Sequence, residues 1–245
     1  MVTTARQQGA ADPKPGLRER KKQQMRQQLS DTATAMFLER GFDAVRVTEV
    51  AEACGVSEKT VFNYFPVKEA LVMDRLEGIL AALRTGLADP MRSPIDAMLA
   101  ILETELRALA GWLAGPAADE PSPPSAPSPP ASAVQARRAI RRFGDLIRAT
   151  PSLRAYQADV LDRSAAVVAQ VLAVRLGVAA DDPEPQIAAR SLLGLWHVHA
   201  ESLRKHLGDE TTEVPSPARL HAQVTADVAR AARLLQDGLS TLPSH

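Results

Sequence analysis

Two short helices joined by a very tight turn are the feature that most restricts how this chain can fold. The stretch VTEVAEACGVSEKTVFNYF, residues 47–65, carries apolar residues at helical spacing on both sides of Cys54-Gly55. We expect Thr48 to cap the first helix and Ser57, two residues past the glycine, to cap the second. So short a junction makes the helices cross steeply, which is the geometry of a helix-turn-helix.

The second of these helices has an outer face that suits a DNA major groove. Val61 is predicted to point to the core, which leaves Lys59, Thr60, Asn63 and Tyr64 outside. An asparagine can bond an adenine edge twice, a threonine methyl can meet a thymine, and lysine and tyrosine can hold phosphates. For Asn63, a phosphate contact or a bond that supports the fold is the alternative.

The segments on either side of this motif add positive charge, although the whole chain has a net charge of zero. Residues 1–30 hold seven Lys or Arg against two acidic residues, and Lys21 and Lys22 lie just before the motif. We expect residues 1–16 to form a disordered arm that touches phosphates, with a solvated tail as the alternative. Lys68 is expected near the start of the next helix, where the helix dipole disfavours a cation unless an anion docks there. The alternative is that Lys68 extends into solvent beside Glu69.

The order of these residues resembles the DNA-binding domain of the TetR family of bacterial transcription regulators. The resemblance is carried by MFLERGFDAVRVTEVAEACGVSEKTVFNYF and the following PVKEALV, and it covers about a fifth of the chain. It implies a homodimer whose N-terminal three-helix domain, residues 17–66, binds a double-stranded DNA operator that is palindromic. The remaining residues, 67–245, would bind a small-molecule effector and form the dimer.

The resemblance also assigns roles to residues. Thr48 would hold a phosphate, Lys59, Thr60 and Asn63 would face bases, and Tyr64 and Lys68 would hold phosphates. Phe62 stands where the family often has tyrosine, so one hydroxyl contact is missing. The predicted DNA-binding set is therefore Lys21, Lys22, Thr48, Ser57, Lys59, Thr60, Asn63, Tyr64 and Lys68.

The larger second part is predicted to be an all-helical bundle. Helical patterns recur over residues 94–114, 132–149, 152–177, 184–207 and 216–240, without alternating runs of β-branched residues. Residues 115–130, GPAADEPSPPSAPSPP, are too rich in proline and serine to continue a helix. We expect a disordered surface loop there, with an ordered polyproline segment as the alternative. The fold class is thus all-α.

The two final helical segments each have a second apolar face. In residues 216–240 one apolar stripe consists of Leu220, Val224, Val228, Ala231 and Leu235. A second stripe of small residues consists of Ala222, Ala226, Ala229 and Ala232. Residues 187–203 show a similar pattern. A helix with two apolar faces needs two partners, so we predict a homodimer through these helices, with a monomeric bundle as the alternative.

An effector pocket would be an apolar cavity with a few polar anchors. The candidates are Trp112, Tyr156, Asp159, Arg163, Trp196 and His199, for each of which a role as core filler, cap or surface charge is the alternative. An arginine-rich segment, with Arg142 among its five arginines, is expected to be a solvated face or to brace the DNA-binding domain.

Catalytic and metal functions find no support in the sequence. His197 and His199 point apart on a helix and lack further ligands, so we expect no metal and no cofactor. We find no paired nucleophile and base, so we do not expect an enzyme. The sequence predicts a cytoplasmic DNA-binding regulator, most readily a repressor that an effector releases. A constitutive DNA-binding protein is the main alternative, and an enzyme on the C-terminal part is a weaker one.

Overall fold

The computed structural model describes residues 16–114, 133–208 and 215–238, and within them every regular element is a helix. The predicted all-α class is therefore confirmed. The expected arm, apart from Gly16, and the Pro/Ser tract at residues 115–130 lie outside the described residues. In chain order the helices are α1 (Leu17–Arg40), α2 (Val47–Ala53), α3 (Glu58–Tyr64), α4 (Lys68–Leu87), α5 (Pro94–Ala114), α6 (Ala133–Ala149), α7 (Pro151–Leu176), α8 (Pro183–Leu207) and α9 (Pro217–Asp237).

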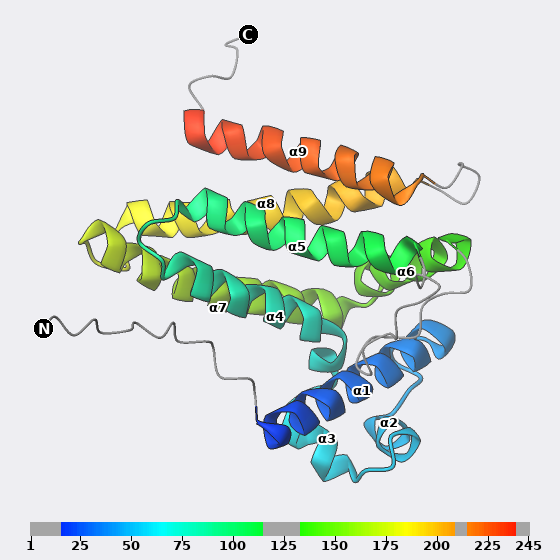
Figure 1. The fold of residues 1–245 in the computed structure, drawn as a ribbon. Helices are drawn as coiled ribbons and strands as arrows, with labels where there is room; N and C mark the ends of the chain where they lie inside the picture. The colour runs from blue at the N-terminus through cyan, green and yellow to red at the C-terminus, as the bar shows by residue number, and fades with distance from the viewer. Residues whose placement is uncertain (1–15, 115–132, 209–214, 239–245) are drawn as a thin grey trace, which may run out of the picture.

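Helices α1, α2 and α3 form a small unit at one end of the molecule, and α4 to α9 form a helical bundle beside it (Figure 1). Helix α4 connects the two parts, because it packs on α1 as well as on α5 and α7. Helix α9 lies at the far edge of the bundle, against α8 and α5. Among the described residues no helix is long and apolar enough to cross a membrane.

The end of α1 is set by local chemistry. Gly41 has φ of 89°, and its N–H donates to the carbonyl of Phe37 at 2.9 Å. The sequence predicts that Gly41 closes this helix and that Phe42 folds back on its last turn, and the Phe37 and Phe42 rings, whose centres lie 5.0 Å apart, confirm this contact.

The start of α2 differs from the prediction. The helix begins at Val47 with Arg46 as its N-cap, so Thr48 lies inside the first turn and does not cap it. Glu49 replaces it, because its carboxylate accepts the Arg46 N–H at 2.7 Å and also pairs with Arg40 at 2.7 Å. A carboxylate in the first turn is favourable, since it faces the free N–H groups of the helix.

Proline is the first residue of four bundle helices, α5, α7, α8 and α9. Proline suits this position because its missing N–H would have no partner there in any case. Ser93 and Ser216 accept backbone N–H groups of the first turn, at 3.0 and 3.2 Å, and so cap α5 and α9. These signals explain why the bundle helices begin close to the predicted positions.

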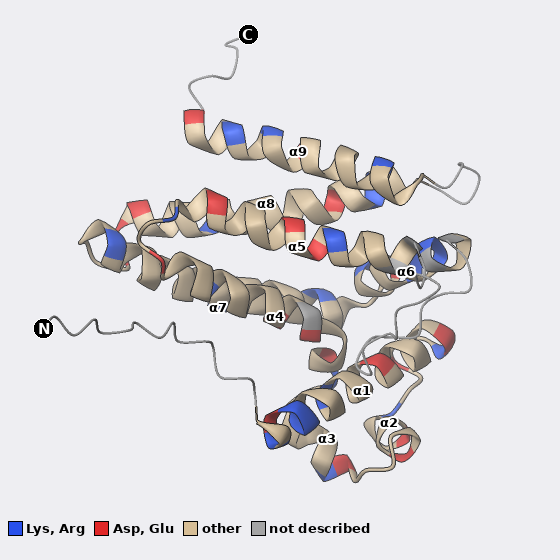
Figure 2. Cartoon of the chain, viewed as in Figure 1, with Lys and Arg blue, Asp and Glu red and all other residues tan. Residues whose placement is uncertain are grey.

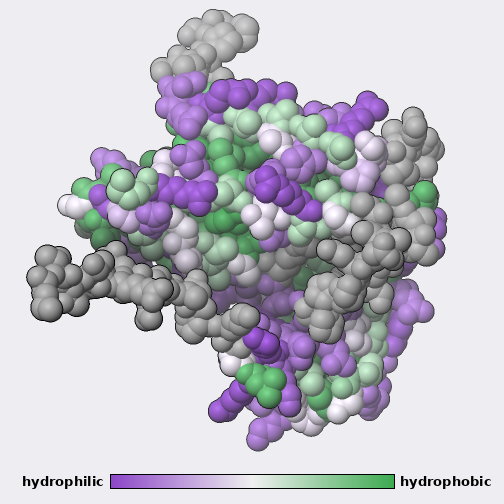
Figure 3. Space-filling view, viewed as in Figure 1, coloured by the Kyte–Doolittle hydropathy of each residue, from purple (hydrophilic) through white to green (hydrophobic). Residues whose placement is uncertain are grey.

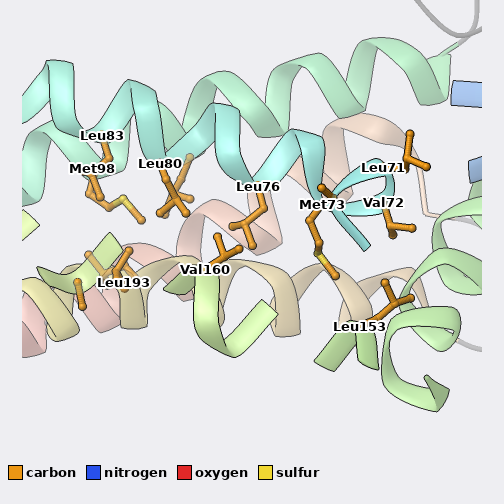
Figure 4. Packing of buried hydrophobic residues seen from close by; sticks show 14 of the residues in the cluster. Leu71, Val72, Met73, Leu76, Leu80, Leu83, Met98, Leu153, Val160 and Leu193 are labelled. Atoms are coloured by element: carbon orange, nitrogen blue, oxygen red, sulfur yellow. The ribbon is translucent and has the colours of Figure 1, made fainter. Parts of the chain in front are cut away.

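The apolar face of α4 forms the centre of the contact with α7. Figure 4 shows Met73 and Leu76 of α4 directed toward Leu153 and Val160 of α7, and all four side chains are buried. Burial of large apolar side chains of this kind contributes about 1.5–3 kcal/mol each relative to exposure. The position of α4 is therefore tied to that of α7.

Helix α9 has the first of its two predicted apolar stripes in the core. Leu220, Val224 and Val228 are at most 4% exposed. Of the second stripe, Ala222 and Ala226 are exposed, whereas Ala232 is buried in the bundle of its own chain. The exposed small-residue stripe is thus narrower than the sequence predicts.

Candidate nucleic-acid interface

The turn between α2 and α3 has the predicted geometry. Gly55 adopts φ of 68°, and the N–H of Val56 donates to the carbonyl of Ala51 at 3.0 Å. Ser57 Oγ accepts the N–H of Thr60 at 3.2 Å, which confirms the cap of α3. Val61 is fully buried and fixes the inner face of α3.

The sequence pattern predicts that Val50 and Ala53 of α2 face the core, and this prediction is only partly confirmed. Val50 is fully buried, but Ala53, which the helical pattern also places inside, is exposed. Ala51 is buried in its place at 2% exposure. The difference follows from the start of the helix at Val47 and from the turn at Gly55, which bends the chain directly after Ala53.

The outer face of α3 presents Lys59 and Asn63, which are both exposed. Thr60 is half-buried, and its hydroxyl lies 2.8 Å from Ser57 Oγ, so both hydroxyls already serve the cap. The methyl group is then the part of Thr60 that remains suited to a base contact. Tyr64 is half-buried and packs against the core.

Phe62, at which the sequence predicts a missing hydroxyl contact, lies at the surface of α3. Its side chain is 43% exposed although it is large and apolar. Its exposure follows from its place in α3, one residue after the buried Val61. A phenyl ring at this position can pack on a sugar or a thymine methyl but cannot donate to a phosphate.

Lys68 is the first residue of α4, where the preceding Val67 gives no side-chain cap. Its Nζ donates to the carbonyl of Phe42 at 2.6 Å and lies 4.3 Å from the centre of the Phe42 ring and 5.4 Å from that of Phe37. Burial lowers the pKa of this lysine, against the opposing influence of nearby carboxylates. These contacts give Lys68 a role within the fold. Its contact with phosphate stays a prediction, for which two further N–H groups remain on the ammonium.

The basic residues of the first helix divide into two groups. Lys21 and Lys22 are exposed near the start of α1, where Figure 2 colours the ribbon blue for Lys and Arg. Arg26 points inward and pairs with Asp74 and Glu77 of α4, at 2.6 and 3.1 Å. Arg26 is one of the seven basic residues of residues 1–30 from which phosphate contact was predicted, and for Arg26 this interpretation is wrong, because its charge is paired within the fold.

The face of the three-helix unit in Figure 3 is mostly hydrophilic, with small hydrophobic areas between the polar side chains. Where basic residues lie on such a surface, it can contact the phosphate backbone of DNA, because phosphate contacts supply most of the binding energy that does not depend on sequence. An exposed Lys59 and Asn63 on a capped helix then provide the groups that can reach base edges.

The bundle braces this unit through α6. An Arg142 N–H donates to the carbonyl of Leu38 in α1, and the residues around this contact enclose a shallow hollow between α1 and α6. The prediction that the arginine-rich segment braces the DNA-binding domain is confirmed for Arg142.

The predicted effector residues do not meet at one hollow. Tyr156 donates its hydroxyl to Glu77 at 3.1 Å, Asp159 and Arg163 pair at 2.9 Å on the exposed side of α7, and the Trp112 side chain lies outside the described residues. Trp196 is half-buried against the core, and His199 is 7% exposed. The effector assignment stays a prediction.

A groove of about 360 Å³ runs between α4 and α7. Its floor is apolar, and of the six predicted effector residues only Arg163 lines it. The remaining lining residues are Glu77, Leu80, Ala81, Arg84, Val160, Ser164, Val167 and Val168.

A capped helix-turn-helix on an all-helical body, with basic and amide side chains exposed on the second helix, defines a DNA-binding transcription regulator. Comparison with known proteins agrees. Residues 29–73 match the N-terminal model of bacterial regulatory proteins of the tetR family, and residues 128–240 match the MftR C-terminal domain.

A similar protein supports the same family. MftR of Mycobacterium tuberculosis, a regulator named for mycofactocin biosynthesis, is 30% identical over 167 residues, which cover 68% of this chain and 73% of MftR. The chain belongs to the TetR family of bacterial transcription regulators.

Two further similarities cover different shares of the chain. The repressor KstR2 of Rhodococcus jostii is 32% identical over 71 residues, which are 29% of this chain and 35% of KstR2. The crystal structure of FadR of Thermus thermophilus, a TetR-family repressor in complex with lauroyl-CoA, aligns with a TM-score of 0.37 at 22% identity. That alignment covers 90% of this chain and 100% of FadR.

Proposed function

We propose that this regulator is a repressor that binds a palindromic operator as a homodimer and leaves it when a small-molecule effector binds. The observation that carries the proposal is α3, whose capped start and buried Val61 fix a helix that presents Lys59 and Asn63 to the outside. The similarity to the repressor KstR2, which covers 29% of this chain, supports the sign of the regulation.

Phosphate contacts from Lys21, Lys22, Thr48 and Tyr64, together with Lys68, would position α3 in the groove. Lys59, Thr60 and Asn63 would then read base edges, with Thr60 using its methyl group because its hydroxyl bonds Ser57. In this account the chain needs no catalytic step and no cofactor.

Selection from a random duplex library tests the proposal directly. Purified protein should enrich a palindrome whose half-sites lie about one helical turn apart, roughly 34–36 Å centre to centre. The enriched duplex should bind at least about a thousandfold tighter than a scrambled one. Enrichment of no sequence would show that the chain does not read DNA.

The exposed small-residue face of α8 and α9 supports the homodimer. Ala222 and Ala226 of α9 and Gly194 of α8 are exposed, and Ile187 is 64% exposed in the single chain. Small residues allow two helix pairs to approach closely in a symmetric contact. Ala226→Glu should give monomers in sedimentation that bind the operator weakly. Ala82→Glu, at an exposed position of α4, should stay dimeric. A monomeric wild type at micromolar concentration would exclude the dimer.

The groove between α4 and α7 supports a small-molecule effector, since it combines an apolar floor with the charged groups of Glu77, Arg84 and Arg163. A thermal-shift screen of diverse metabolites should find a compound that stabilises the protein and releases the selected operator. If no compound in the screen does either, the protein acts as a constitutive DNA-binding protein.

A further inference from the structure

Arg26 of α1 contacts two other helices, α3 and α4, at the junction between the DNA-binding unit and the bundle. Its Nη1 donates to the carbonyl of Tyr64 at 2.9 Å, its Nε to Asp74 at 2.6 Å and its Nη2 to Glu77 at 3.1 Å. The guanidinium also lies 4.5 Å from the centre of the Phe65 ring. A single side chain thus joins α1, the end of α3 and the first half of α4.

The contact with Tyr64 matters because Tyr64 is the last residue of α3. The final carbonyls of a helix have no partner within that helix, and a cation near them is favourable. Arg26 satisfies this carbonyl from α1, so the direction of the DNA-reading helix depends on where the guanidinium is held.

Glu77 extends these contacts into the bundle. One of its oxygens accepts from Arg26, and the other accepts the hydroxyl of Tyr156 in α7 at 3.1 Å. Burial and the Glu77 carboxylate raise the pKa of Tyr156, so the phenol keeps its proton at neutral pH and can donate this bond. A continuous polar chain therefore runs from α7 through α4 and α1 to the end of α3.

This series of polar contacts lies beside the groove of the bundle. Glu77 also lines the groove between α4 and α7, so a molecule in the groove would contact Glu77, the residue that joins Arg26 to Tyr156. The apolar contacts of Met73 and Leu76 with α7 hold the two helices together beside it (Figure 4). Movement of α7 relative to α4 must either shift the Glu77 side chain or break its hydrogen bond to Tyr156.

We propose that Arg26 is a positioning residue for the DNA-reading helix, and that Tyr156 of α7 sets its position through Glu77. The proposal rests on the proposed DNA-binding function. It makes α7 the element of the bundle whose state is coupled to operator affinity, which is the requirement for allosteric control.

A double-mutant cycle on operator affinity tests the coupling. Tyr156→Phe removes only the hydroxyl and should weaken binding to the selected operator about threefold to tenfold, because one bond to a carboxylate is lost. In a Glu77→Gln background the same change should cost less than about twofold. Equal affinity of Tyr156→Phe and wild type, or independent effects of the two changes, would overturn the proposal.

Arg175 provides a matched control between the same helices. It joins α7 to the carbonyl of Leu87, the last residue of α4, at 3.2 Å, and to that of Arg92 in the segment after α4 at 2.8 Å. Arg175→Gln should lower the urea midpoint of unfolding and leave the operator dissociation constant of the folded protein unchanged. If Tyr156→Phe also lowers only the urea midpoint, its role is structural and the proposal fails.

Arg26 is tested by the salt dependence of binding. Arg26→Lys keeps the charge but loses the planar guanidinium with its several N–H donors, and Arg26→Met removes the charge. Both should weaken operator binding while the slope against salt stays within a few tenths of the wild-type value, since Arg26 touches no phosphate in this account. Lys22→Met should lower the slope by about one. A slope lowered by one in Arg26→Met would make Arg26 a phosphate contact.

Fluorine NMR separates a failure of this proposal from a failure of the proposed function. The chain has two tyrosines, so protein labelled with 3-fluorotyrosine gives one signal from Tyr64 and one from Tyr156. Operator binding should shift both signals, and Glu77→Gln should abolish the shift of Tyr156 only. A shift of Tyr64 alone would refute the coupling while DNA binding stands. Failure to bind any duplex would refute the function itself.

Discussion

Replacing Lys68 by methionine should destabilise the DNA-binding unit by about 2 kcal/mol. Methionine keeps the apolar stem and removes the ammonium, which donates to the Phe42 carbonyl at 2.6 Å and lies over two phenyl rings. A hydrogen bond to a charged group contributes about 1.5–3 kcal/mol, and a partly exposed cation–π contact about 0.5–1 kcal/mol. Desolvation, which lowers the pKa of Lys68, offsets part of this gain.

Urea unfolding followed by circular dichroism measures the effect. With a slope of about 2 kcal/mol per molar urea, the midpoint should fall by about 1 M. Lys59→Met is the control, since Lys59 is exposed on α3 and should change the stability by less than about 0.5 kcal/mol. A Lys68→Met midpoint equal to that of the wild type would show that the contacts with Phe37 and Phe42 do not stabilise the fold. The same variant should lower the salt slope of operator binding by about one if Lys68 also holds a phosphate.

Two further predictions concern the bundle. Bonds from His206 and Ser202 lower the pKa of Asp227 to about 2, so its stabilisation is complete above pH 3.8 and is lost as the pH falls toward 2. Asp227→Asn should therefore unfold with about 1–2 kcal/mol less stability than the wild type at pH 5.5, after allowance for solvent screening. The difference should shrink as the pH falls through about 2, where half of the Asp227 carboxylates of the folded state are protonated. A constant difference across this range would contradict the assignment. Replacing residues 115–130 by a short Gly/Ser linker should leave thermal unfolding cooperative and operator affinity unchanged, because a Pro/Ser-rich tract is expected to bury little surface. Loss of cooperative unfolding would show that the tract is structural.

Local signals in the sequence predicted the elements well. Gly41 ends α1 and Ser57 begins α3 because each acts on a backbone within a few residues of itself. The predicted cap of α2 at Thr48 was wrong. The helix begins one residue before Thr48, and the carboxylate of Glu49, three residues after Arg46, accepts a backbone N–H at its start. Competition between neighbouring polar residues is difficult to resolve without coordinates.

Contacts between distant segments were the part that the sequence could not provide. Arg26 meets Tyr64, Asp74 and Glu77 across 38, 48 and 51 positions of the chain. Its place in a basic segment indicated a surface charge, and only the packing of α1 on α4 turns it inward. The predicted effector residues do not line one groove for a similar reason, because a helical pattern does not fix how α5, α7 and α8 are rotated around a shared cavity.

The central claim is that the outer face of α3 reads bases, and Asn63→Ala tests it most directly. Wild type, Asn63→Ala and the phosphate control Lys22→Met would be titrated against the selected operator and a scrambled duplex at several salt concentrations. Asn63→Ala should lose about 1–3 kcal/mol on the operator and relax the preference at one position of each half-site, while scrambled binding and the salt slope stay nearly unchanged. Lys22→Met should weaken both duplexes alike. If Asn63→Ala also weakens both duplexes in the same proportion, Asn63 on α3 does not read bases.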